Sequence, residues 1–178
     1  MTAPGATGKV DGVVLGTVEN VDDPDHQGRV RVRIVELGEN FLTTWAPIAS
    51  PMAGKDRGSW FVPEVGDEAV VSFQRGDVNY PIVVGFVWNG EDTAPSTAVR
   101  ERLIRSKNGH TIRLIDSTET AGGNRGAVVI EDGHGNHIVL TNGKVTIQST
   151  GVLELSGQRV IITSSGVPRV VSPTGNPI

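Results

Sequence analysis

Apolar and polar residues follow two different patterns along the chain, and the pattern changes near residue 90. Five runs rich in β-branched and aromatic residues precede this point: 13–18, 29–35, a run ending at Val62, 69–73 and 82–87. The second run alternates, with Val30, Val32 and Ile34 on one side and three arginines on the other, which predicts a strand with one buried face. The last run is apolar at nearly every position, which predicts a strand buried on both faces.

Turn residues between these runs indicate how the strands connect. Pro63-Glu64-Val65-Gly66 predicts a turn in which Gly66 takes a positive φ, and Arg75-Gly76-Asp77 predicts a second turn. The proline-broken residues 46–54 predict an irregular connection. A small closed barrel buries such strands economically. Residues 10–90 are therefore predicted to form a five-stranded barrel of the oligonucleotide/oligosaccharide-binding (OB) type, preceded by a flexible arm at residues 1–9.

A predicted linker at residues 91–103 leads into a repetitive region. Residues 108–114 are echoed by residues 135–140, with His110 and His137 interpreted as equivalent positions. Further short strands are predicted at residues 144–148, 152–155 and 158–163. Short strands with glycine turns at near-regular spacing are typical of a β-solenoid or β-prism, so the whole chain is predicted to be all-β.

A single ribbon of such strands buries little apolar surface by itself. Ordering each residue costs about 1–2 kcal/mol of backbone entropy. Burial returns about 25 cal/mol per Å² only where the apolar face is covered. Because the sequence contains no evident second sheet to cover this face, another copy of the chain is expected to do so.

Six short motifs in the first half occur in a fixed order. They are Gly28-Arg29-Val30-Arg31-Val32, Trp45-Ala46-Pro47-Ile48-Ala49, Ala53-Gly54-Lys55 with Gly58, Phe61-Val62-Pro63-Glu64-Val65-Gly66-Asp67-Glu68, Phe73-Gln74-Arg75-Gly76-Asp77 and Pro81-Ile82-Val83-Val84-Gly85. With this ordered set, residues 10–90 resemble the OB domain of phage baseplate assembly protein V and of the related VgrG spike proteins. The start of the second half, residues 104–110, is similar to the start of the needle in members of that family.

This resemblance implies a homotrimer in which residues 104–178 form an intertwined triple-stranded β-helix, or β-prism. It also implies a structural role without enzymatic activity, as the central spike of a contractile injection system. Such a spike sits below the tube hub and pierces the target envelope when the sheath contracts. The trimer core is predicted to contain the apolar positions of the repeats: Ile112, Leu114, Ile138, Leu140, Val145, Ile147, Leu153, Leu155, Val160 and Ile162.

The same resemblance implies partners for the chain. The large hub region of VgrG proteins is missing from this sequence, so a separate hub protein is expected at the OB end. Val170, Val171 and Ile178 leave apolar surface near the C-terminus, which in the family is covered by a PAAR-type tip protein. The target cell envelope is expected as a transient partner. Phage virions, tailocins, extracellular injection particles and type VI devices share this spike, so the type of machine stays open.

The composition of the chain bears on its possible sites, its cellular location and its ligands. The chain has no cysteine, which excludes disulfides and thiolate metal sites. Its first residues have no basic segment and no apolar core, and no apolar run approaches the length of a membrane span. We therefore expect synthesis and assembly in the cytoplasm without a signal peptide, and function in the baseplate of a tail-like particle. A net charge of −4 does not favour phosphate-rich ligands, so no nucleic-acid partner is expected.

Three histidines raise the question of a metal site. His134 and His137 are three positions apart, and His110 occupies a similar turn in the preceding repeat. Either these rings bind an ion, or they are polar residues of ordinary turns. The turn interpretation is preferred, and no metal or cofactor is predicted.

Carboxylates form one cluster, at Glu64, Asp67 and Glu68. Neighbouring residues of a strand point to opposite faces, which makes Asp67 and Glu68 a poor acid–base pair. The sequence contains no nucleophile motif or phosphate loop either. No catalytic residue is therefore predicted.

An alternative function is an OB-fold binding module for an oligosaccharide or single-stranded nucleic acid. Such barrels combine basic grooves with stacking aromatic residues. The arginines of run 29–35 are interpreted either as a phosphate-binding stripe or, preferably, as a solvent-facing side balanced by the aspartates of residues 22–25. Trp45, Trp60 and Trp88 lie in or beside apolar runs, so core or trimer contacts are expected for them.

Overall fold

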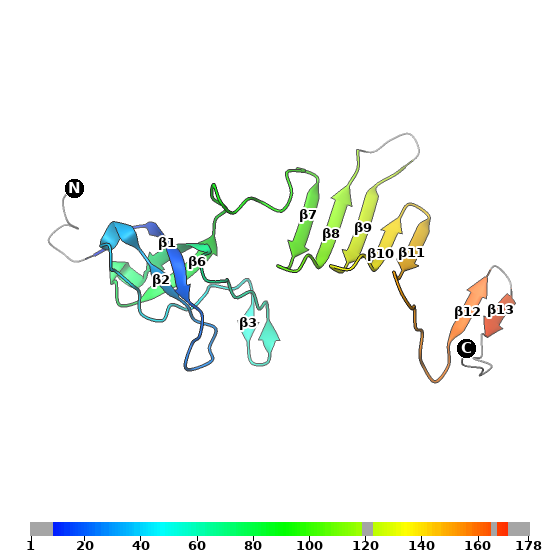
Figure 1. The fold of residues 1–178 in the computed structure, drawn as a ribbon, viewed down its shortest axis with the longest axis horizontal. Coiled ribbons are helices and arrows are strands. Elements are labelled where there is room, and N and C mark those ends of the chain that lie inside the picture. The colour runs from blue at the N-terminus through cyan, green and yellow to red at the C-terminus, as the bar shows by residue number, and fades with distance from the viewer. Residues whose placement is uncertain (1–8, 119–122, 165–166, 171–178) are drawn as a thin grey trace. The chain divides into compact units, whose positions relative to one another are not determined.

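The computed structural model describes residues 9–118, 123–164 and 167–170 of the chain (Figure 1). Over these residues the secondary structure is β, apart from two 3₁₀ turns, η1 at Val35–Leu37 and η2 at Gln74–Gly76. The prediction of an all-β chain is therefore confirmed. The chain divides into two compact units between Ala94 and Pro95, and each is described by itself.

The first unit contains a four-stranded antiparallel sheet. Its strands are β1 (Val13–Asn20), β2 (Arg31–Arg33), β5 (Glu68–Phe73) and β6 (Pro81–Phe86), in the spatial order β2-β1-β5-β6. A small hairpin of β3 (Ala53–Gly54) and β4 (Arg57–Gly58) lies in the long connection between β2 and β5.

The segment 42–49 closes this sheet into a barrel. On one side it bonds to β2 and to the residue before β2: Leu42 bridges Arg33, and Val30 and Ala46 exchange N–H···O bonds of 3.0 and 2.8 Å. On the other side Ile48 bridges Val83 of β6. Both edges of the sheet thus find partners in one irregular segment, which takes the place of a fifth strand.

Two details of the predicted barrel are wrong. The run ending at Val62 belongs to no strand, and Trp60 and Phe61 are largely exposed. The closing segment instead lies in residues that include Pro47, part of the stretch predicted as a plain connection. Proline and small residues hide the strand-like role of this segment, because the bonds that define it join residues far apart in the sequence.

Nine residues fill the barrel interior: Val18, Val30, Val32, Ile34, Ala46, Ala69, Val71, Phe73 and Val83. The predicted inward face of the alternating run is therefore confirmed. β6 is not buried on both faces, since Val84 and Phe86 remain 47% and 42% exposed. The outer side of a barrel strand has nothing to pack against within one chain. Gly66 has a φ of 104°, as predicted for the turn before β5.

Thr43 completes the bonding between the closing segment and β2. Its side chain is buried, and its Oγ1 accepts a 3.0 Å hydrogen bond from the Val32 N–H. Its own N–H donates to the Val32 carbonyl at 3.0 Å. The hydroxyl therefore satisfies a buried donor that would otherwise have no acceptor.

The second unit contains a five-stranded antiparallel meander. Its strands are β7 (Glu101–Arg105), β8 (Thr111–Asp116), β9 (Gly126–Glu131), β10 (His137–Thr141) and β11 (Lys144–Gln148). Each strand pairs with its neighbour in sequence, as Figure 1 shows. A separate hairpin of β12 (Ile161–Ser164) and β13 (Val167–Val170) follows.

This meander differs from the expected elements in several places. β7 begins inside the stretch predicted as a linker, and β9 was not predicted. Residues 152–155 form no strand, and the strand predicted at 158–163 begins only at Ile161. Within one chain the strands do not coil as in a solenoid but run back and forth in one sheet.

We expect Thr43→Val to destabilise the barrel by about 1–3 kcal/mol, because the buried Val32 N–H loses its acceptor. Urea unfolding followed by tryptophan fluorescence measures this, since all three tryptophans lie between residues 45 and 88. Thr43→Ser keeps the hydroxyl and is expected to lose less. Thr44→Val is the matched control at an exposed neighbour; equal losses for T43V and T44V would contradict the assignment.

Candidate functional site

One face of the β7–β11 sheet is almost entirely apolar. In-register pairing places Ile104, Ile112, Ile130, Ile138 and Ile147 in one row across all five strands. A second row on the same face, two residues along each strand, contains Arg102, Leu114, Val128, Leu140 and Val145. Arg102 lies at the edge of the sheet and pairs with Asp116 at 3.0 Å. We call this surface the isoleucine face.

No described residue of the chain covers the isoleucine face. Eight of its aliphatic side chains are between 37% and 64% exposed. Soluble monomeric proteins rarely expose a contiguous apolar surface of this kind, which normally marks an interaction site. It is therefore the main candidate functional surface of the second unit.

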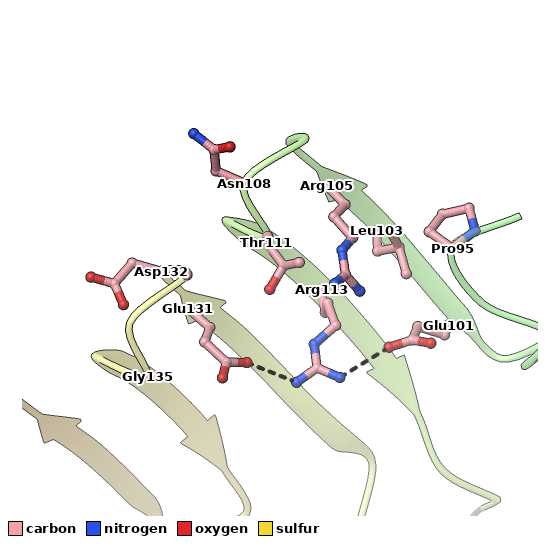
Figure 2. Close-up of a pocket in the computed structure, with 12 residues that line it drawn as sticks. Pro95, Glu101, Leu103, Arg105, Asn108, Thr111, Arg113, Glu131, Asp132 and Gly135 are labelled. Atoms are coloured by element: carbon pink, nitrogen blue, oxygen red, sulfur yellow. Dashed lines mark hydrogen bonds and ion pairs between the residues drawn. The ribbon is translucent and has the colours of Figure 1, made fainter. Parts of the chain in front are cut away.

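The opposite face of the same sheet combines charged residues (Glu101, Arg113 and Glu131) with apolar ones (Leu103, Val129 and Val139). Figure 2 shows Arg113 of β8 between Glu101 of β7 and Glu131 of β9, with a 3.4 Å ion pair on each side. These residues line a hollow of about 460 Å³ that also includes Thr111 and Arg105. Because each carboxylate already faces the arginine, the charges largely compensate one another. Aliphatic side chains thus dominate the isoleucine face, whereas the opposite face combines charged and apolar side chains.

Six of the ten predicted trimer-core residues lie together on the isoleucine face: Ile112, Leu114, Ile138, Leu140, Val145 and Ile147. Leu153, Leu155 and Val160 lie in the stretch without strands after β11, and Ile162 lies in β12. Of the predicted tip contacts, Val170 ends β13, whereas Val171 and Ile178 lie outside the described residues.

Sequence reasoning missed three members of the isoleucine face, namely Ile104, Val128 and Ile130. Residues 127–131 are rich in β-branched residues and lie between two glycine-containing segments, which is typical of a strand. They do not match the repeat formed by residues 108–114 and 135–140. Counting every apolar pair spaced by two residues between glycine turns would have found Val128 and Ile130.

The repeat itself is offset by one position from the predicted alignment. The turns 106–110 and 132–136 have the same hydrogen bonds: Ser106 N–H to His110 O and Asp132 N–H to Asn136 O. Gly109 and Gly135 have matching φ values of 87° and 89°. His110 is therefore equivalent to Asn136, and the interpretation of His110 and His137 as equivalent positions is wrong.

The histidines of these turns bond to nearby turn residues. His110 Nδ1 accepts from the Gly133 N–H at 3.2 Å, and His137 Nδ1 lies 3.1 Å from the Gly135 carbonyl. His134 lies 3.8 Å from Asp132, whose pKa is lowered to about 2, mainly by a hydrogen bond from the Asn136 side chain. Over the described residues no three His, Asp or Glu side chains gather as metal ligands.

The three arginines of the alternating run each have a partner within the barrel unit. Arg29 makes two bonds to Asp23, through Nε at 3.0 Å and Nη2 at 2.6 Å. Arg31 donates to the Thr43 carbonyl at 3.0 Å, and its guanidinium lies 6.0 Å from the centre of the Trp45 ring. Arg33 pairs with Glu19. These contacts support the solvent-face interpretation over a phosphate-binding stripe.

In the predicted carboxylate cluster of Glu64, Asp67 and Glu68, the Asp67 side chain closes a turn. Asp67 Oδ2 accepts a 2.9 Å hydrogen bond from the Glu64 N–H just before β5. Burial raises the pKa of Asp67, and the nearby Asp92 adds to this effect. The geometry is that of a side chain closing a turn.

The tryptophans are not core residues of this chain. Trp45 is half-buried beneath Arg31, while Trp60 and Trp88 are 72% and 69% exposed. Of the two expected roles, a core position is therefore wrong for Trp60 and Trp88, and a trimer contact stays a prediction.

Comparison with known proteins identifies the first unit. Residues 14–88 match the family described as "Type VI secretion system/phage-baseplate injector OB domain". This stretch is an injector OB domain. The match covers β1, β2, β5 and β6 with the closing segment between them, so the predicted resemblance to baseplate and VgrG-like spike proteins is confirmed.

Spike proteins of type VI secretion systems are among the relatives. VgrG1a of Pseudomonas aeruginosa is 36% identical over 97 residues, which are 52% of this chain and 15% of that protein. VgrG3 of Vibrio cholerae is 33% identical over 100 residues, covering 52% of this chain and 10% of VgrG3. VgrG2a of P. aeruginosa is 26% identical over 132 residues, or 65% of this chain and 16% of VgrG2a, so this similarity extends beyond the injector OB domain.

The chain thus spans only about a sixth or less of the length of these relatives. What it shares with them is the injector OB domain and some adjoining sequence. Among the described residues, no helix has the length and apolar character needed to cross a membrane.

Asp23 provides a test of the barrel's electrostatics. Its buried carboxylate accepts bonds from Arg29 and from three backbone N–H groups, which hold its pKa well below the ordinary range. A carboxyl group with a lowered folded-state pKa stabilises the fold above its unfolded pKa of about 3.9, and this contribution is lost as pH falls below that value.

We therefore expect the urea midpoint of the barrel to fall as pH decreases from 5 to 2, with a smaller decrease in Asp23→Asn. Tryptophan fluorescence at each pH measures the midpoints. Asp22→Asn changes an exposed neighbour that lies outside the ion pair and should follow the unmodified protein. Parallel curves for all three proteins would contradict the role given to Asp23.

Proposed function

We propose that this chain is the trimeric central spike of a phage-tail-like contractile injection system. The observation that carries the proposal is the uncovered isoleucine face in the same chain as an injector OB domain. The injector OB domain indicates a contractile injection system. The isoleucine face favours assembly because its apolar side chains are exposed in one chain.

Energetics favour covering the isoleucine face. Burying a fully exposed leucine or isoleucine is worth about 1.5–3 kcal/mol, so a half-exposed one retains roughly 1 kcal/mol. Eight such side chains give on the order of 5–10 kcal/mol per chain. This is as large as the whole stability of many small domains, so an isolated chain would leave much of its available stabilisation unused.

A threefold arrangement lets each copy contribute one apolar side of a prism. The isoleucine faces of three chains meet at the axis, and the faces with Arg113, Glu101 and Glu131 point outward. Residues 104–178 then form the needle, residues 91–103 the linker, residues 10–90 the barrel and residues 1–9 a flexible arm. In this needle Leu153, Leu155, Val160 and Ile162 extend the core below β11.

The proposed function is mechanical. Burial between chains along a slender prism makes unfolding slow, which a piercing tip requires. The spike sits below the tube hub, with the injector OB domain toward the hub, and crosses the target envelope when the sheath contracts. A PAAR-type tip protein covers the C-terminal end at Val170, Val171 and Ile178. The chain is assembled in the cytoplasm and acts in the baseplate.

The trimer is tested by mass in solution. We expect light scattering after gel filtration to give three chains of 18.8 kDa each. Ile147→Glu, which places a charge on the isoleucine face, is expected to weaken the trimer strongly. Gln148→Glu adds the same charge one residue along the same strand, on the opposite face, and should remain trimeric.

A monomer at micromolar concentration in the unmodified protein would overturn the trimer. So would equal loss of trimer in I147E and Q148E, because only I147E removes an apolar side chain and places a charge on the isoleucine face. Circular dichroism shows whether I147E keeps its β structure.

The spike assignment is tested in the bacterium that encodes the chain. We expect an epitope-tagged chain to co-sediment with sheath-containing particles, at a ratio of three copies per particle. Deleting its gene should leave no contractile particles with assembled baseplates. Normal particles in the deletion strain, with the tagged chain remaining in the soluble fraction, would contradict the proposal.

A further inference from the structure

Trp60 is held at the surface of the injector OB domain by an unusual support. Its indole is 72% exposed, and its six-membered ring lies against Gly28. A Cβ added at Gly28 would lie 2.5 Å from Cη2 and 2.8 Å from Cζ3 of the indole. Gly28 also has a φ of 71°, which favours glycine. Only a residue without a side chain fits beneath the ring in this position.

The loop that carries Gly28 is fixed by a buried ion pair. The Asp23 side chain is 2% exposed and bonds to the Arg29 guanidinium at 2.6 and 3.0 Å. It also accepts from the N–H groups of Asp25, Gln27 and Arg29 at 2.9–3.2 Å. The support of the Trp60 ring is therefore preorganised, which lowers the entropy that a bound ligand would have to offset.

A hollow of about 360 Å³ lies beside the ring. Its lining combines apolar residues (Val21, Pro24, Trp60 and Val62) with the polar residues Asp22 and His26 and with Asp23 and Gly28. This volume is at the lower end of the range for small-molecule sites. Asp22 is exposed, and its carboxylate takes no part in the Asp23–Arg29 network. The hollow thus offers one aromatic platform, with the acceptor-bearing Asp22 among its lining residues.

The charge of the loop beside Trp60 determines which class of ligand can stack on the indole. The loop brings Asp22, Asp23 and Asp25 close together, against the single cation of Arg29. Single-stranded nucleic acid is bound by aromatic residues in positively charged grooves, and phosphates would be repelled here. An uncharged sugar ring has no such penalty. Its polarised C–H groups suit the negative face of an indole, and its hydroxyls can donate to a carboxylate.

We propose that this hollow is a glycan subsite, in which Trp60 stacks against a pyranose ring of an uncharged oligosaccharide and Asp22 accepts a hydrogen bond from a sugar hydroxyl. The loop between the first two barrel strands is one of the regions through which OB folds bind oligosaccharides. The subsite lies on the outside of the barrel and does not depend on the proposed spike function.

The test uses the full chain with two uncharged probes, cellotetraose and chitotetraose, in isothermal titration calorimetry. We expect saturable binding of at least one probe, weakened about tenfold or more in Trp60→Ala. Asp22→Asn is expected to weaken binding severalfold. Trp88→Ala removes a similarly exposed tryptophan that does not line the hollow and should bind as the unmodified protein does.

Four results would overturn the subsite. One is no binding of either probe up to about 10 mM. Another is equal binding by the W60A and W88A variants. The third is Trp60-dependent, salt-sensitive binding of single-stranded DNA without sugar binding, which would assign the platform to nucleic acid. Acrylamide quenching of the unmodified protein against Trp60→Phe shows whether Trp60 is accessible in the assembled protein; an inaccessible ring would also overturn the proposal.

Discussion

A sheet one layer thick can bury one of its faces only against something outside itself. This constraint governs the second half of the chain, where five strands pair in sequence and no helix or second sheet packs on their apolar side in the described residues. The isoleucine rows are regular because in-register pairing aligns every second residue of each strand. The regularity makes the face a continuous surface that identical faces can match.

The injector OB domain meets its constraints within one chain. The segment 42–49 bonds to both edges of its sheet, and nine apolar residues fill its interior. The buried N–H of Val32 donates to the hydroxyl of Thr43. Arginines on its outside are paired locally. The barrel thus closes within one chain, whereas the sheet of the second unit leaves its isoleucine face exposed over the described residues.

The two units also present different chemistry to partners. The isoleucine face is apolar and suits another copy of the same chain, because burial is its main source of affinity. The Trp60 hollow combines one aromatic ring with acidic side chains on a fixed loop, and suits a ligand with both C–H and hydroxyl groups. The hollow around Arg113 is balanced by its own glutamates and offers less to a ligand.

Local alternation in the sequence was enough to predict the all-β class and the inward face of Val30, Val32 and Ile34, and turn residues were enough to predict the positive φ of Gly66. It also placed Ile112 and Leu114 with Ile138 and Leu140 in one pattern, because side chains in a strand repeat every two residues. The identity of the barrel-closing segment could not be predicted in this way. Its bonds join residues such as Ile48 and Val83, whose approach depends on the closure of the whole sheet. The one-residue offset of the repeats, the exposure of Trp60 and the complete isoleucine rows likewise depend on register and packing across distant strands, which only the tertiary structure decides.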